Sequence, residues 1–171
     1  MKVVGRFRDD QYEDKGVDHI RKIVRAVVLD KDNHVALNKI YSTDMFGPRD
    51  YYELPGGGVK RGETLREALH REIEEEIGCR IDIVQEMGEV IDRYNLIFRE
   101  NHNYFYLARV SEYVAQKLEE DEKILIEKVV WVDIDEAIRL CEGMQNVLVG
   151  RLVKQRELPI LRKAEEIIKS L

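Results

Sequence analysis

Cysteine and proline are scarce in this chain of 171 residues, and it has no long uninterrupted hydrophobic run. Two cysteines, Cys79 and Cys141, are too few for a disulfide framework and are typical of a reducing cytoplasm. No apolar stretch approaches the roughly 20 residues that cross a bilayer. Charged residues between Lys2 and Asp10 interrupt any secretory signal. We therefore expect a cytoplasmic protein with no membrane partner.

Cationic runs are also absent. The 28 Lys and Arg residues are outnumbered by 34 Asp and Glu residues, which gives a formal net charge of −6. General affinity for a nucleic-acid backbone needs clustered positive charge, so we do not expect it here. A composition of 44% hydrophobic and 36% charged residues predicts a globular rather than a disordered chain.

Strand and helix patterns alternate along the chain. Strands are predicted over residues 22–29, 34–41, 80–92, 103–110 and 129–132, the first two forming a hairpin around a turn at 30–33. Helices are predicted over 65–77, 134–141 and 146–171, the last interrupted at Pro159. Polar loops are expected over 42–50 and 119–122. These elements predict a single α/β (α+β) domain over residues 1–171.

The two ends of the chain differ in character. Residues 1–18 form a short, densely charged segment, which is either ordered by docking against the rest of the protein or not ordered at all. The tail over 146–171 is helical in pattern, and we expect it to pack on the domain or to pair two subunits in a homodimer.

The helix over 65–77 has clear boundaries and an unusual polar face. Thr64 and Glu67 form a capping box, and Gly78 is placed to end the helix. Three carboxylates, Glu72, Glu75 and Glu76, share one face at the edge of the apolar stripe. They repel one another unless a cation joins them, and oxygen ligands suit Mg²⁺ or Mn²⁺.

Three glycines, Gly56, Gly57 and Gly58, precede this helix and let the backbone approach a ligand closely. Helix N-terminal N–H groups favour anions. Glycines, helix and carboxylates together predict a site for a metal-bound phosphate ester. Each feature alone has an ordinary explanation: the glycines as a turn, and the acidic face as a solvated surface.

The segment from Gly57 to Cys79 resembles the Nudix box. Ile73 fills an aliphatic position of that motif, and Cys79 replaces the usual Ile, Leu or Val at the last one, a change expected to affect packing only. Leu54-Pro55 and Trp131-Val132 extend the resemblance over roughly residues 22–140. All seven fixed positions of the motif are met: Gly57, Glu63, Arg71, Glu72, Glu75, Glu76 and Gly78.

The resemblance implies a Nudix-type α/β/α sandwich with a mixed β-sheet. It also implies a hydrolase that cleaves the pyrophosphate linkage of a nucleoside diphosphate joined to another moiety, by attack of water on phosphorus. By the same resemblance, Glu72, Glu75 and Glu76 hold Mg²⁺ (or Mn²⁺), with Glu72 and Glu76 as the main direct ligands and the Gly57 carbonyl as a further one. Glu63 and Arg71 brace the loop against the helix, and Gly56–Gly58 contact the substrate.

The general base and the substrate stay open at this level. The base is Glu75 or another glutamate of the box, or a carboxylate among Glu119, Glu120, Glu122 and Glu127, whose ordinary explanation is a solvated loop. The proline that the family's ADP-ribose hydrolases carry beyond the box is missing, and Tyr94 only approximates the tyrosine of its diadenosine polyphosphate hydrolases. Ordinary structural roles are favoured for the side chains that can also bind phosphate or stack on a base: Arg25, Arg49, Tyr51, Tyr104 and Tyr106.

Two other functions share the same resemblance. The first is a non-catalytic nucleotide-sensing module, which is disfavoured because such members usually lose box carboxylates. The second is an isomerase of an isoprenoid diphosphate, which nothing outside the box supports. We do not expect a DNA-binding winged helix, because the 21 residues after Gly150 are too few to form one.

Overall fold

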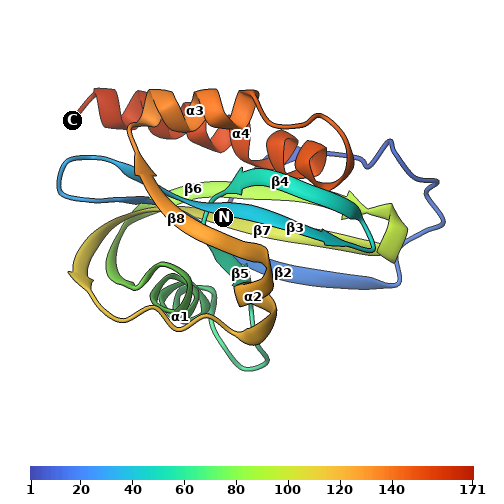
Figure 1. Ribbon diagram of the computed structural model, residues 1–171, viewed down its shortest axis with the longest axis horizontal. Helices are drawn as coiled ribbons and strands as arrows, with labels where there is room; N and C mark the ends of the chain where they lie inside the picture. Colours follow the sequence, from blue (N-terminus) through green and yellow to red (C-terminus); the bar gives the residue numbers. More distant parts are fainter.

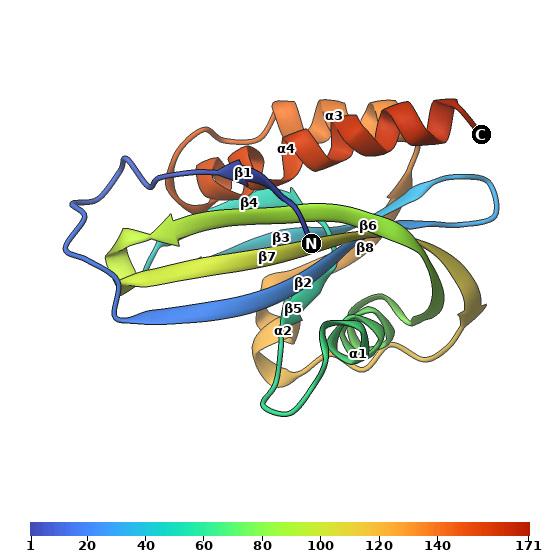
Figure 2. The ribbon, with the colours of Figure 1, turned by 180° about the vertical axis from the view of Figure 1, so that it is seen from behind.

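One mixed sheet of eight strands organises the chain, and the computed structural model describes all residues 1–171. The strand order is β1-β6-β7-β2-β3-β4, with β5 paired to β2 and β8 paired to β3. Helices α3 and α4 cover one face, and α1 and α2 lie on the other (Figures 1 and 2). The elements are β1 (Val3–Arg6), β2 (His19–Leu29), β3 (Val35–Asp44), β4 (Gly47–Glu53), β5 (Gly56–Gly58), α1 (Leu65–Ile77), β6 (Cys79–Tyr94), the 3-10 turn η1 (Asn95–Ile97), β7 (Arg99–Tyr113), α2 (Glu120–Leu125), β8 (Ile126–Val132), α3 (Ile134–Glu142) and α4 (Leu148–Lys169).

The predicted α/β/α sandwich with a mixed sheet is confirmed. β1 runs parallel to β6 and β2 runs parallel to β7, whereas the remaining pairings are antiparallel. A larger core packs the sheet against α3 and α4, and a smaller one packs it against α1. None of the helices combines the length and the apolar character that crossing a bilayer requires.

Helix α1 has the boundaries that its sequence predicts. The Thr64 side chain accepts a hydrogen bond from the Glu67 N–H at 3.2 Å, and Glu67 accepts one from the Thr64 N–H at 2.8 Å. Gly78 ends the helix in the left-handed conformation, with φ of 65°. Leu69 and Ile73 are fully buried against the sheet. The packed face therefore fixes how α1 presents its carboxylates.

Helix α4 differs from its prediction, because Pro159 lies inside it without interrupting it. Proline removes one backbone hydrogen bond and crowds the preceding turn. Val153, Ile160 and Leu161 are almost completely buried in the core beside the sheet. Their burial stabilises the helix on both sides of the proline. The tail thus packs on the sheet, one of the two roles expected for it.

Two predicted loops are regular structure. Residues 42–50 complete a hairpin, in which β3 runs to Asp44 and β4 starts at Gly47. Pro48 is tolerated because β4 is an edge strand. The acidic stretch at 119–122 begins helix α2, where Glu119 and Glu122 form a reciprocal cap. Acidic residues in the first turn of a helix interact favourably with the helix dipole, so this polar stretch can begin a helix instead of forming a loop.

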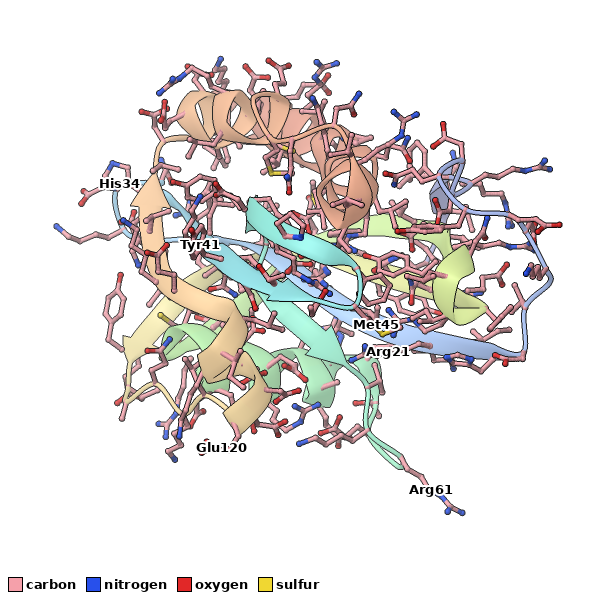
Figure 3. The ribbon with its side chains drawn as sticks, turned by 45° about the vertical axis from the view of Figure 1, so that its right-hand side comes forward. Arg21, His34, Tyr41, Met45, Arg61 and Glu120 are labelled. Carbon is pink, nitrogen blue, oxygen red and sulfur yellow. The ribbon has the colours of Figure 1, made fainter.

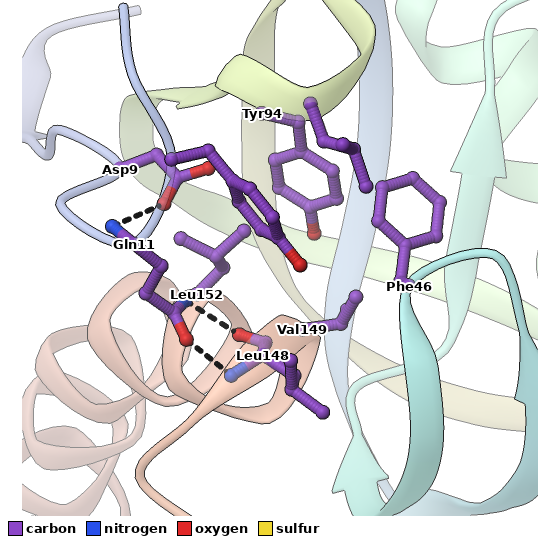
Figure 4. Close-up of a pocket in the computed structure, with 9 residues that line it drawn as sticks. Asp9, Gln11, Phe46, Tyr94, Leu148, Val149 and Leu152 are labelled. Carbon is purple, nitrogen blue, oxygen red and sulfur yellow. Dashed lines mark hydrogen bonds between the residues drawn. The ribbon is translucent and has the colours of Figure 1, made fainter.

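The charged N-terminal segment is ordered by docking. β1 extends the sheet beside β6. Further on, the Gln11 side chain donates to the Leu148 carbonyl at 2.9 Å and accepts from the Leu148 N–H, so it holds the first residue of α4 (Figure 4). The cavity left in this seam measures about 10 Å³, room for one water at most. The seam is therefore a packing contact and not a ligand site.

Candidate active site

The sheet splits beside β2, and a cleft opens at the split. Ile23–Arg25 of β2 pair with Gly56–Gly58 of β5, whereas β2 meets β3 only at Leu29 and Val35. The cleft has a volume of about 480 Å³. Its walls come from β2, β4, β5, β6, β7, α1, α2 and the first half of α4. Segments far apart in the sequence thus contribute to one site.

Three carboxylates form a cluster in this cleft. Glu72 and Glu76 of α1 and Glu122 of α2 bring oxygens within 4.8 Å of one another. Glu72 and Glu76 are only 5% and 6% exposed. Burial raises the pKa of Glu72 and raises that of Glu76 well above its usual range, and the neighbouring carboxylates add to both shifts. Burial and mutual repulsion disfavour the charged form of these carboxylates. A divalent cation would neutralise them, and oxygen ligands of this kind suit one.

Glu76 is oriented by two donors from outside its helix. Its carboxylate accepts hydrogen bonds from the Gly56 N–H at 2.8 Å and from the Asn38 side chain at 2.9 Å. The backbone reaches it because Gly56 has φ of 147°, a conformation that other residues rarely adopt. At Gly57, a Cβ atom would lie 2.5 Å from a carboxylate oxygen of Glu72. Both glycines are therefore required for this approach of loop and helix.

Arg71 joins the glycine loop to the helix. It binds both oxygens of Glu63 at 2.5 and 2.8 Å and the Gly58 carbonyl at 3.0 Å. It also donates to Glu72 at 2.7 Å and to Glu75 at 3.1 Å. The pair lowers the pKa of Glu63 to about 2 and raises that of Arg71. Such a multidentate guanidinium fixes the direction of the neighbouring carboxylates.

Glu75 and the later acidic residues occupy different places. The Glu75 carboxylate meets Arg71, and the third member of the cluster is Glu122. Glu119 pairs with Lys60 at 3.0 Å, and Glu120 pairs with Lys123 at 2.7 Å on the outer side of α2 (Figure 3). Glu127 is exposed. Of the four acidic residues left open by the sequence, only Glu122 joins the box carboxylates in this cluster.

A buried ion-pair network also lines the cleft, and its Arg25 and Glu53 act on the charge of Glu76. Glu53 binds Arg25 at 2.8 Å and Arg156 at 2.6 Å, and Arg156 also binds Glu157 at 3.0 Å. Tyr94 is buried and its hydroxyl accepts from Arg156 at 3.3 Å. Sequence reasoning missed Glu53, Arg156 and Glu157, since nothing local in the sequence pairs them. The network becomes visible only in the folded structure, where these opposite charges are buried together.

The other side chains that the sequence offered for binding phosphate or a base are held by contacts within the protein. Arg49 pairs with Asp44 at 2.7 Å and donates to the Tyr51 hydroxyl at 2.9 Å. Tyr106 packs in the core under α1, and Tyr104 packs against that core. Neither tyrosine lines the cleft. Arg25, Arg49 and Tyr51 do line it, but both arginines have carboxylate partners.

An α/β/α sandwich with buried carboxylates on a helix behind a glycine loop is the arrangement expected of a Nudix domain. The family model described as NUDIX domain matches residues 19–149. The chain belongs to the Nudix family. Most of α4 lies beyond the matched residues.

Individual relatives agree with this assignment. The chain is 35% identical over 81 residues to an 8-oxo-dGTP diphosphatase of Haemophilus influenzae, an alignment that covers 46% of this chain and 57% of that protein. It is 35% identical over 106 residues to an RNA pyrophosphohydrolase of a Nitratiruptor species, covering 61% and 67% of the two chains. It therefore spans little more than half the length of the first relative.

A solved structure shows the same fold. The Caenorhabditis elegans Ap4A hydrolase, solved as a binary complex, superposes with a TM-score of 0.64 over 88% of this chain and 99% of that one. The sequence identity is 16%, so the likeness extends to the fold alone.

Proposed function

We propose that the protein is a Mg²⁺-dependent Nudix hydrolase, active also with Mn²⁺, that cleaves the pyrophosphate linkage of a nucleoside diphosphate joined to another moiety. Candidate substrates are a nucleotide, a nucleotide sugar and a dinucleotide. One observation carries this proposal: the carboxylates of Glu72, Glu76 and Glu122 converge within 4.8 Å at the glycine loop. Family membership supports it, because all seven fixed positions of the box are occupied.

Glu72 and Glu76 are the residues best placed to hold the ion, with the Gly57 carbonyl as a further ligand. A bound Mg²⁺ supplies charge neutralisation at the phosphates and lowers the pKa of a coordinated water. The chain keeps Glu76 in place through Gly56 and Asn38, and Glu72 through Arg71. Glu75 shares the Arg71 guanidinium, so its role is to hold that guanidinium rather than to face the ion.

We assign the role of general base to Glu122, which accepts the proton of the attacking water. No arginine or lysine pairs with its carboxylate, which lies beside Glu72 and Glu76. Burial raises the pKa of Glu122 and makes it a stronger base. The water oxygen bonds to phosphorus while the bond from phosphorus to the bridging oxygen breaks. The proton passes to a Glu122 oxygen, and the leaving phosphate departs with the bridging oxygen.

The substrate range includes compounds with a phosphate chain, because the relatives named above carry the names 8-oxo-dGTP diphosphatase and RNA pyrophosphohydrolase. The test is a hydrolysis screen in Mg²⁺ over nucleoside triphosphates, sugar nucleotides, dinucleotides and RNAs with 5′-triphosphate or capped ends. Turnover of any member supports the enzyme. Nucleotide binding with no turnover of any member would favour the sensing module instead.

The remaining expectations form part of the same proposal. A single domain over residues 1–171 is supported by the one sheet that both cores share. A cytoplasmic location is supported by the buried free thiols of Cys79 and Cys141. A homodimer is tested by sedimentation of the purified chain, where one species at the monomer mass would exclude it.

A further inference from the structure

Two arginines in the cleft have no partner, unlike the other three. Arg25, Arg49 and Arg156 each pair with a carboxylate. Arg21 of β2 and Arg99 of β7 also line the cleft, yet neither makes a hydrogen bond or an ion pair, and the buried Nε atom of Arg99 lacks any acceptor. Arg21 is exposed to solvent, whereas Arg99 is half-buried. A guanidinium group carries five donors and is normally paired where protein surrounds it, as it does at Arg99.

At this end of the cleft, each of the two arginines is acted on by the charge of another arginine. Desolvation lowers the pKa of Arg21 and the charge of Arg25 lowers it further, whereas the charge of Glu72 opposes both effects. The pKa of Arg99 is lowered by desolvation first and then by the charges of Arg21 and Arg156. Guanidinium groups that repel one another gain stability when an anion joins them. This arrangement mirrors that of the carboxylate cluster, which gains stability when a cation joins it.

Arg21 lies close to the carboxylate cluster, and Arg99 lies close enough to Arg21 for the two charges to interact. The Arg21 guanidinium is packed against Gly58, where a Cβ atom would lie 2.7 Å from its Nη2. Gly58 is the next residue after Gly57, which touches Glu72. Arg99 is stacked on the Tyr94 ring, with 5.1 Å between the guanidinium carbon and the ring centroid. This stacking holds Arg99 in place before any ligand arrives.

We propose that Arg21 and Arg99 form an anion subsite that binds the terminal phosphate of a phosphate chain whose pyrophosphate linkage lies at Glu72 and Glu76. This inference rests on the proposed function and narrows its substrate class to compounds with a free terminal phosphate. A terminal phosphate presents three oxygens and a charge of about −2, which matches two guanidinium forks. An internal phosphate, as in a dinucleotide or a nucleotide sugar, offers two free oxygens and a single negative charge.

The test compares Arg21→Gln and Arg99→Gln with the control Arg61→Gln. Arg61 is exposed at the tip of the loop between β5 and α1, and it lines no part of the cleft (Figure 3). KM and kcat are measured in Mg²⁺ for a nucleoside triphosphate and for a dinucleoside polyphosphate. Loss of one charge-assisted hydrogen-bonding group is expected to raise KM for the triphosphate roughly tenfold to a hundredfold. KM for the dinucleotide is expected to change far less, and the control to change neither.

A binding measurement separates this inference from the proposed activity. Inorganic tripolyphosphate is titrated calorimetrically into each protein at low salt, with and without Mg²⁺. Weaker binding by the Arg21 and Arg99 variants supports the subsite even if the wild type hydrolyses nothing, in which case only the proposed function fails. Absence of binding by the wild type, or variants that bind like the control, overturns the subsite even if the enzyme is active.

Two further outcomes are decisive. Equal losses for the triphosphate and the dinucleotide would place a shared internal phosphate at the arginines and overturn the terminal-phosphate assignment. The thermal midpoint of ligand-free Arg21→Gln is expected to stay close to that of the wild type, because the change removes no hydrogen bond or ion pair and removes both a repulsion from Arg25 and an attraction to Glu72. A lower midpoint would indicate a structural role. If Arg99→Gln fails to fold because the stacking on Tyr94 is lost, Arg21→Gln decides the question alone.

Discussion

Glu157, on the last helix, accepts a hydrogen bond from the backbone N–H of Leu54 at 2.8 Å. Arg25 donates to the carbonyl of the same Leu54 at 2.8 Å, so both polar groups of this residue are held by buried side chains. Two residues later, the Gly56 N–H binds Glu76. Helix α4 is therefore connected to the carboxylate cluster through three residues of backbone, although Glu157 lies beyond the residues that the family model matches.

This connection predicts that Glu157→Ala damages both the stability and the metal site. The change leaves Glu53 as the only carboxylate paired with Arg156 and removes the acceptor of the Leu54 N–H. Breaking a buried pair in this way costs about 3–5 kcal/mol of unfolding free energy. We expect urea denaturation to show that loss. Calorimetry is expected to show Mg²⁺ binding weakened by about tenfold or more, as for other changes that disturb ligand orientation.

Glu166→Ala is the matched control, because Glu166 lies on the exposed side of the same helix and makes no ion pair. Its unfolding free energy should stay within about 0.5 kcal/mol of the wild type. If Glu157→Ala behaves like this control, α4 does not hold the glycine loop.

Glu76→Gln is expected to abolish turnover while the protein stays folded. Glu76 is buried, and its pKa is raised, so a neutral side chain of the same shape suits the ligand-free site. The amide is a poor metal ligand, and loss of the charge stabilisation supplied by the ion amounts to several kcal/mol, or on the order of a thousandfold in kcat.

Glu74→Gln serves as the comparison on the same helix, since Glu74 faces Arg80 at 3.6 Å rather than the cleft. It should retain the wild-type rate. A Glu76→Gln protein that hydrolyses substrate at a near-normal rate in Mg²⁺ would refute the mechanism proposed above.

The pH dependence of metal-free stability follows from the same residue. Because the pKa of Glu76 is raised in the folded state, that state binds more protons than the unfolded chain above the ordinary glutamate pKa of about 4.3. Its contribution to stability is therefore lost as the pH rises from that value through the folded pKa. We expect the unfolding free energy of Glu76→Gln minus that of the wild type to increase over this window.

Mg²⁺ should oppose this loss, because it binds the deprotonated carboxylates and stabilises the folded state more strongly as the pH rises. Denaturation of both proteins at several pH values, with and without Mg²⁺, measures the difference. If the difference in unfolding free energy between Glu76→Gln and the wild type does not change with pH, the folded protein does not disfavour the charged form of Glu76.

The sequence predicted what is decided locally. The caps Thr64, Glu67 and Gly78 set the ends of α1, and the i, i+4 spacing placed Glu72 and Glu76 together. Contacts between distant segments of the chain could not be predicted from the sequence. Neither the place of α2 after β7 nor the pairing of Arg156 with Glu53 has a local signal, since each depends on how distant segments pack. The same limit explains Pro159, whose local preference was overridden by core contacts.

Glu122, the general base proposed above, is the residue that the sequence left among several alternatives. Glu122→Gln is expected to lower kcat by about a hundredfold or more with little change in KM, because general-base catalysis contributes about 10²–10⁴. Stability should be retained, since a glutamine carbonyl can still accept the bond from the Glu119 N–H that caps α2. Glu120→Gln, on the outer side of the same helix, is the control. The competing assignment makes the opposite prediction: if Glu75→Gln loses kcat and Glu122→Gln does not, the proton goes to the carboxylate that meets Arg71.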